Sequence, residues 1–192
     1  MHFRYRALAF FCLFGLPVWA ADPSAVTVIQ NFHQVSQNVY RGAQPNPTGI
    51  RYLATLGVKV VLDLREHDQR SIDEQRLVST AGMRYVNVPM TGMTPPTAAQ
   101  ISQILALLED EVAGPVFVHC KRGADRTGAV IAAYRIDHDN WDNVRALNEA
   151  MSDHMSRWQF NRQQFIRTFQ GKAANASVAK GSDTSSAVAD KN

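Results

Sequence analysis

The stretch VFVHCKRGADRTG, residues 116–128, decides how this chain folds and what it can bind. Its first three residues are apolar and follow Gly114-Pro115, so they predict a short buried strand. A loop follows at 119–126, and a helix is expected from about Thr127 to Asp137. Ligands of α/β proteins bind at such a loop, beyond the carboxyl end of a strand.

The residue types in this loop suit the binding of a phosphoryl group. A loop that leads into a helix presents successive backbone N–H groups and the positive helix end to an anion. Gly123 allows close approach of the backbone, and the planar Arg126 side chain can grip two oxygens. Such surroundings lower a cysteine pKa from about 8.5 to ~3.5–7.5, which favours a Cys120 thiolate. Thr127 can donate its hydroxyl to that sulfur.

The rest of the chain alternates strands and helices. Capping boxes are read at Ser71 with Glu74 and at Thr97 with Gln100. This order predicts a single α/β domain with a mainly parallel central sheet flanked by helices. Residues 65–68 follow the first core strand and should lie on the same side as the loop. The expected strands are 58–64, 85–88 and 116–118, and the expected helices are 46–56, 71–81, 97–108, 127–137, 142–151 and 157–169.

The N-terminus has the pattern of a secretory signal peptide. Arg4 and Arg6 precede an apolar run at 7–16, and cleavage is expected after Ala20. That run is shorter than the roughly 20 residues needed to span a bilayer, so no stable membrane insertion is expected after cleavage. The protein should therefore be exported, to the periplasm or the medium. The predicted organisation is a signal peptide at 1–20, a lead-in at 21–34, a domain at 35–170 and a disordered tail at 171–192.

Charge and cysteine content narrow the function further. Without Arg4 and Arg6, 18 basic residues stand against 17 acidic ones, so basicity gives no reason to expect nucleic-acid binding. Loss of Cys12 with the signal peptide would leave Cys120 without a partner for an intramolecular disulfide. A lone thiol in an oxidising compartment indicates a reactive cysteine as one option. Nothing in the sequence indicates an oligomeric state.

Residues 119–128 resemble the signature of the cysteine-dependent protein tyrosine phosphatase superfamily, His-Cys-x5-Arg followed by Ser or Thr. The segments 39–45 and 57–65 resemble its bacterial and atypical dual-specificity branch, so the resemblance covers roughly 35–170. It implies a dual-specificity phosphatase fold and a two-step reaction through a cysteinyl-phosphate on Cys120, without metal or cofactor. It also implies that His119 holds the loop and that phosphate contacts come from Lys121, Arg122, Gly123, Ala124, Thr127 and Gly128.

The acid that should protonate the leaving group is missing from its usual place. The family usually supplies an Asp about thirty residues before the cysteine, but 87–102 contains neither Asp nor Glu. Asp125 is the first choice, because it resembles the in-loop Asp of myotubularins and of some secreted bacterial phosphatases. Its neighbour Arg126 should, however, lower its pKa and disfavour the protonated form. Asp68 is the reserve, and solvent or no acid at all is the third option.

These observations favour a phosphomonoester hydrolase of the tyrosine or dual-specificity type that acts on a phosphorylated protein. Lys121 and Arg122 also suit a phosphoinositide or inositol phosphate, although Ala124 stands where such enzymes often carry a second Lys. A phosphate-binding module without turnover is the alternative of another class. Sulfur transfer of the rhodanese kind is disfavoured, because Asp125-Arg126-Thr127 suits phosphate better.

Other residues leave two interpretations open. Arg41 and Gln44 contact substrate or belong to a turn before a helix, and Arg65 lines the pocket or pairs with a nearby carboxylate. Trp141 and Trp158 are expected to pack in the core.

Overall fold

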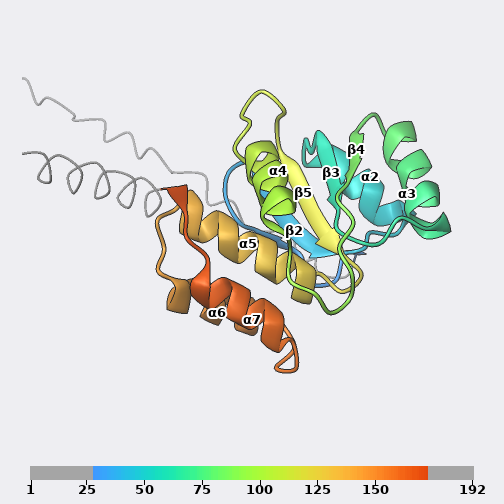
Figure 1. Cartoon of the computed structure of the whole chain (residues 1–192). Helices are drawn as coiled ribbons and strands as arrows, with labels where there is room; N and C mark the ends of the chain where they lie inside the picture. Colours follow the sequence, from blue (N-terminus) through green and yellow to red (C-terminus); the bar gives the residue numbers. More distant parts are fainter. Residues whose placement is uncertain (1–27, 173–192) are drawn as a thin grey trace, which may run out of the picture.

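A five-stranded sheet runs through residues 28–172, the part of the chain that the computed structural model describes. Its spatial order is β1-β2-β5-β3-β4 (Figure 1). The strands β2, β5, β3 and β4 are parallel, whereas β1 pairs antiparallel with β2. The predicted α/β domain with a mainly parallel sheet is confirmed. The strands are β1 (His33–Gln34), β2 (Val39–Ala43), β3 (Val60–Asp63), β4 (Arg84–Asn87) and β5 (Val116–Cys120).

Helices cover both faces of this sheet. Residues of α4 and α5 join one buried cluster with one face, and residues of α2 and α3 join a second cluster with the other. The helices α6 and α7 pack outside α5 (Figure 1). The central strands β3 and β5 are buried along their whole length, which explains why they are apolar almost throughout. The helices are α2 (Pro47–Thr55), α3 (Gln69–Thr80), α4 (Ala98–Leu108), α5 (Asp125–Asp137), α6 (Asn143–Ser152) and α7 (Phe160–Thr168).

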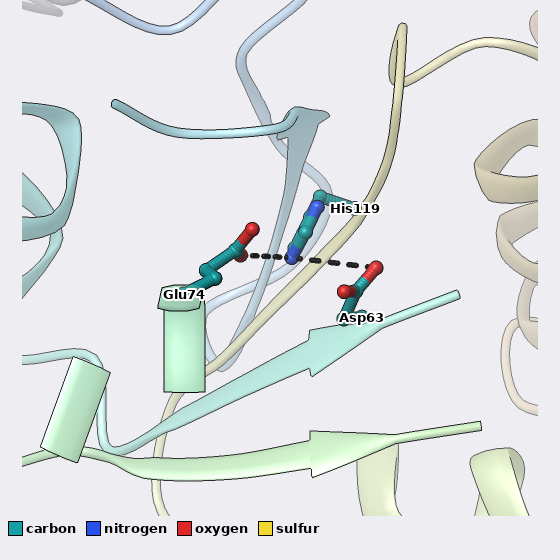
Figure 2. A group of neighbouring side chains, drawn as sticks. All are labelled: Asp63, Glu74 and His119. Atoms are coloured by element: carbon teal, nitrogen blue, oxygen red, sulfur yellow. Dashed lines mark ion pairs between the residues drawn. The ribbon is translucent and has the colours of Figure 1, made fainter. Parts of the chain in front are cut away.

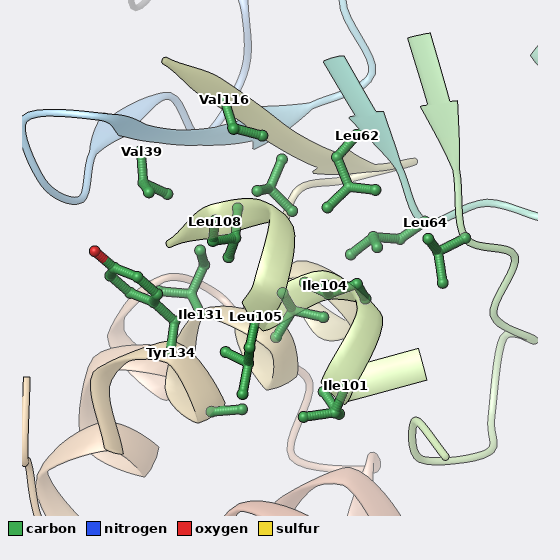
Figure 3. Packing of buried hydrophobic residues seen from close by; sticks show 14 of the residues in the cluster. Val39, Leu62, Leu64, Ile101, Ile104, Leu105, Leu108, Val116, Ile131 and Tyr134 are labelled. Carbon is green, nitrogen blue, oxygen red and sulfur yellow. The ribbon is translucent and has the colours of Figure 1, made fainter. Parts of the chain in front are cut away.

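The larger cluster fixes α4 and α5 against the sheet. Leu62 of β3 and Val116 of β5 meet Ile104 and Leu108 of α4 and Ile131 of α5 (Figure 3). Full burial of such a side chain contributes about 1.5–3 kcal/mol relative to exposure. Because α5 begins directly after the loop, this packing also fixes the position of the predicted phosphate loop.

The start of α3 differs from the sequence prediction. A capping box at Ser71 and Glu74 is wrong, because Asp68 is the N-cap and the helix begins at Gln69. The Asp68 carboxylate accepts bonds from the N–H groups of Arg70 and Ser71, and the Ser71 hydroxyl accepts one from the Asp68 N–H. Ser71 is thus the N3 residue of the box and not its N-cap, and Glu74 lies outside the box, where its side chain is buried. The predicted box at the start of α4 is confirmed.

The described domain extends beyond the predicted boundary at residue 35. Ile29 is 1% exposed in the core, and β1 belongs to the sheet, so part of the expected lead-in packs with the domain. At the other end, Lys172 pairs with Glu109 and Asp137. The expected signal peptide and residues 173–192 of the expected tail lie outside the described residues.

Of the two tryptophans that were expected to pack in the core, Trp141 packs against a buried cluster and Trp158 does not. Trp158 is 69% exposed, because α7 begins only at Phe160 and the tryptophan lies in the preceding turn. Trp141 is half-buried, and the guanidinium groups of Arg135 and Arg145 lie 4.5 and 3.6 Å from its ring centre.

Between residues 28 and 172, no helix has both the length and the apolar character required to cross a membrane.

Replacing Asp68 by alanine should lower the free energy of unfolding, because it removes the side-chain acceptor that caps the first turn of α3. Asp68→Asn keeps an acceptor oxygen at the cap and should lose much less. Urea unfolding followed by circular dichroism measures both variants. Equal losses for the two substitutions would contradict the capping role.

Candidate active site

The loop of residues 121–124 joins the end of β5 to the start of α5 and lies against β2. Gly123 has a φ of +67°, and a Cβ placed on it would lie 2.3 Å from the carbonyl carbon of Gly42. Only glycine satisfies both conditions, since other residues rarely adopt a positive φ and none fits at that distance. The Gln44 N–H donates to the Lys121 carbonyl at 3.4 Å. The backbone of β2 therefore forms the wall behind the loop.

Arg41 fastens this wall to the loop. Its side chain is buried, donates to the Gly123 carbonyl at 2.5 Å, and forms an ion pair of 2.5 Å with Asp153. Asn31 donates to the carbonyls of the same two residues, at 2.9 and 3.0 Å. Arg41 is thus a structural residue, and neither substrate contact nor a simple turn explains it. Asp153 and Asn31 gave no sequence signal, because the chain brings them to the loop only through the fold.

Cys120 is the last residue of β5 and is 3% exposed. Burial alone would raise the pKa of its thiol. The nearby hydroxyl and N–H of Thr127, the charge of Arg126 and the N–H of Arg122 outweigh burial and hold that pKa below its usual value. The structure therefore surrounds the sulfur with groups that favour the thiolate, which is the nucleophilic form.

Arg126 is held at the mouth of the loop by two carbonyl groups. Its guanidinium donates to the Met90 carbonyl at 3.1 Å and approaches the Leu64 carbonyl at 3.5 Å. The segment around Met90 occupies the place where the family usually carries its acid. Here it supplies a fixed acceptor that orients the arginine.

A cationic pocket of about 210 Å³ opens beside Arg126. Four of the six residues that line it carry a positive charge, which suits a phosphoryl group and its substituents. A larger hollow of about 660 Å³ lies along α4 and α7, and no residue of the loop lines it. The smaller pocket is therefore the candidate substrate site. It is lined by Gln44, Arg65, Glu66, Arg70, Lys121 and Arg126.

The other loop residues take different places. Arg122 is exposed and pairs with Asp125 at 2.5 Å, whereas Ala124 is buried at the N-cap of α5. Of the residues expected to contact phosphate, Lys121 lines the pocket, whereas Arg122, Gly123, Ala124, Thr127 and Gly128 do not, and neither does His119. Gly128 faces Met155, since a Cβ there would lie 3.0 Å from that side chain, and its N–H donates to the Ala124 carbonyl. It serves the packing of α5 against α6.

Neither predicted acid points into the pocket. Asp125 accepts a bond from the Ser156 N–H at 2.8 Å with one oxygen and from Arg122 with the other. Asp68 caps α3 and accepts from Arg70, and this bond lowers its pKa. Glu66 is the carboxylate among the residues that line the pocket. The sequence pattern did not single it out as an acid. Its position directly after β3 was the available signal.

His119 lies beneath the loop, within a buried group of charges. Its Nε2 atom is 2.7 Å from Glu74 and 3.9 Å from Asp63 (Figure 2). Three possible ligand atoms of these residues lie within 4.8 Å of one another, as in a metal site. The Arg65 guanidinium, however, binds both carboxylates at 2.6 and 2.5 Å. It supplies the positive charge that a cation would bring, so the group fits a metal ion poorly.

The comparisons with known proteins agree with this geometry. The family described as DSP-PTPase phosphatase fused to NAD+ kinase matches residues 20–168. The dual specificity protein phosphatase TpbA of Pseudomonas aeruginosa is 35% identical over 135 residues, which cover 69% of this chain and 57% of that protein. The chain thus spans little more than half the length of this relative.

One further relative and one solved structure of TpbA are described with different phosphorylated compounds. The inositol diphosphatase DSP3 of Arabidopsis thaliana is 25% identical over 143 residues, covering 72% of this chain and 70% of that protein. A crystal structure of a Cys-to-Ser variant of P. aeruginosa TpbA with phosphotyrosine is 27% identical, with a TM-score of 0.65. It covers 83% of this chain and 93% of that one.

The matched range includes the whole loop, the strand before it and the helix after it. The chain belongs to the DSP-PTPase family, within the atypical dual-specificity branch of the cysteine-dependent protein tyrosine phosphatases.

Proposed function

We propose that the protein hydrolyses phosphate monoesters of the phosphotyrosine or dual-specificity kind through Cys120. The observation that carries this proposal is the buried thiol of lowered pKa at the base of a loop whose arginine faces a cationic pocket. TpbA, a similar protein, is named a dual specificity phosphatase, and its variant has been solved with phosphotyrosine.

In the first step the Cys120 thiolate attacks phosphorus, an S–P bond forms and the P–O bond to the leaving alcohol breaks. The alkoxide takes up a proton, and Arg126 with the loop N–H groups stabilises the charge on the equatorial oxygens. In the second step water attacks the phosphocysteine, the S–P bond breaks and phosphate leaves. The Thr127 hydroxyl then donates to the sulfur, which departs as the thiolate.

The source of the proton follows from the carboxylates around the pocket. Asp125 would have to leave at least one of its two hydrogen-bond donors before it could protonate an alkoxide. Glu66 lines the pocket together with Arg126 and needs no such rearrangement. Geometry therefore favours Glu66 over Asp125, and Asp68 serves the helix cap.

A second substrate class is supported by the charge of the pocket. Arg65, Arg70, Lys121 and Arg126 together suit a substrate with several phosphates, such as an inositol phosphate. A diphosphate releases a phosphate that needs little protonation on leaving, which fits the absence of Asp and Glu from 87–102. The similar Arabidopsis protein is named an inositol diphosphatase.

We also propose that the protein is exported. Arg4, Arg6, the apolar run at 7–16 and Ala20 support this location. Cys12 would be removed with the leader, and the burial of Cys120 would limit access of oxidants to its thiol.

Replacing Cys120 by serine should reduce phosphate release from a phosphotyrosine peptide to background, because serine has no thiolate at the pH of the assay. Phosphate release is measured by a colorimetric assay between about pH 5 and 7, the range that a lowered thiol pKa opens to activity. Binding of vanadate to Cys120→Ser serves as the control for an intact pocket. If the unchanged protein binds vanadate but releases no phosphate, a binding module without turnover replaces the enzyme.

The variant Glu66→Gln should lower kcat for a phosphotyrosine peptide by about 10²-fold or more, the usual contribution of a general acid. Asp125→Asn, the matched comparison, should lower kcat less, because that carboxylate already accepts two bonds. The reverse order of the two effects would make Asp125 the acid.

Replacing Arg70 by glutamine should separate the two substrate classes. If polyphosphates are the substrates, KM for an inositol diphosphate should rise several-fold while KM for a phosphotyrosine peptide stays constant, because one cation of the pocket is lost. Arg76→Gln, an exposed arginine on the same helix and outside the pocket, is the control. Equal behaviour of both substrates in both variants would count against the inositol diphosphate.

A further inference from the structure

Four charged side chains form a buried group beneath the loop: Asp63, Arg65, Glu74 and His119. They come from β3, the segment after it, α3 and β5, and none is more than 7% exposed. Figure 2 shows the His119 ring with Glu74 on one side and Asp63 on the other. The catalytic steps proposed above use none of these groups directly.

The contacts within this group involve nearly every polar atom. Arg65 donates to both oxygens of Asp63 at 2.6–3.0 Å and to one Glu74 oxygen at 2.5 Å. Tyr85 donates its hydroxyl to Asp63 at 2.7 Å. The second Glu74 oxygen lies 2.7 Å from Nε2 of His119, a close charge contact that is not a well-aligned hydrogen bond.

The charges of the group balance only if His119 is protonated. Two carboxylates and one guanidinium leave one uncompensated negative charge, which is unfavourable in a buried site. Both ring nitrogens of His119 also face acceptors, since Nδ1 lies 3.4 Å from the Cys120 carbonyl and Nε2 faces Glu74. A neutral imidazole can donate from only one nitrogen, so the imidazolium fits both contacts.

The charges around His119 also favour its protonated form. Burial lowers the pKa of His119, but Glu74 and then Asp63 outweigh burial and raise it above its ordinary value, against a smaller opposing effect of Arg65. Phe117 stacks on the ring at 5.6 Å and adds no charge.

We propose that Glu74 is a positioning residue, which keeps His119 as an imidazolium bound to the Cys120 carbonyl and thereby favours the Cys120 thiolate. The fixed ring orients the first peptide of the loop, and its positive charge lies one residue from the sulfur. Because Glu74 also holds Arg65, which lines the pocket, the same carboxylate links the nucleophile to the phosphate site. This role rests on the proposed function of Cys120 as the nucleophile.

Other groups act on the same sulfur and must stay unchanged in a test. Arg126, Thr127 and the Arg122 N–H favour the thiolate directly, and the more distant charges of Arg41 and Arg162 also interact with it. Glu74→Gln leaves all of them in place. It keeps the size of the side chain and an acceptor oxygen for Arg65, and it removes the negative charge that both His119 and Arg65 face.

The first experiment measures alkylation of Cys120 by iodoacetamide as a function of pH, with mass spectrometry of the peptide that contains it. Glu74→Gln should move the midpoint upward by about one pH unit, which means about tenfold less thiolate below the midpoint. Asp73→Asn, an exposed neighbour on the same helix, should leave the midpoint unchanged. An unchanged midpoint in folded Glu74→Gln overturns the proposal.

The second experiment needs no variant at position 74 and applies even if Glu74→Gln does not fold. Nitrogen-15 spectra of the His119 ring, recorded on the unchanged protein, should show both nitrogens protonated at pH 7. A neutral tautomer at pH 7 overturns the proposal.

Alkylation and ring spectra report on the thiol and imidazole alone, whereas phosphate release tests the enzyme. A shifted alkylation midpoint without phosphatase activity would support the role of Glu74 and contradict the proposed function. Phosphatase activity with an unshifted alkylation midpoint would support the proposed function and contradict the role of Glu74.

Discussion

The close contact between the backbones of Gly123 and Gly42 constrains the rest of the site. It brings the loop against β2 at a distance that no side chain permits, and Arg41 fixes it there from behind. Once the loop is held, the N–H groups of Arg122 and Thr127 act on the Cys120 sulfur, and Arg126 lines the pocket beside it. The shape of the loop is thus set by backbone placement and by Arg41 behind it.

Positive and negative charges are layered around this loop. The pocket above it carries four cations, whereas Asp63 and Glu74 are buried below it. Arg65 belongs to both layers, because its guanidinium binds the two carboxylates and also lines the pocket. A cation that is already neutralised from behind can meet a phosphate without being strongly repelled by Arg126. The arrangement concentrates positive charge at the pocket while keeping the interior close to neutral.

The features that the sequence predicted well are local ones. The strand 116–120, the loop and the first turn of α5 are continuous in the chain, so the surroundings of Cys120 could be inferred from neighbouring residues. The mainly parallel sheet followed from the alternation of short apolar segments with amphipathic ones. The roles of Arg41 and Glu74 depend on which elements become neighbours, and no local pattern contains that information. At Asp68 and Ser71 two capping patterns overlap, and the carboxylate three residues earlier is the one that caps the helix.

The contacts that hold the Gly123 carbonyl have a consequence for folding. Asn31, Arg41 and Asp153 come from the first and the last parts of the domain, and all three meet at one carbonyl or beside it. A nascent polypeptide therefore cannot complete these contacts until the segment around Asp153 has been synthesised. The loop is therefore held against β2 in full only when the first and the last parts of the domain have packed together.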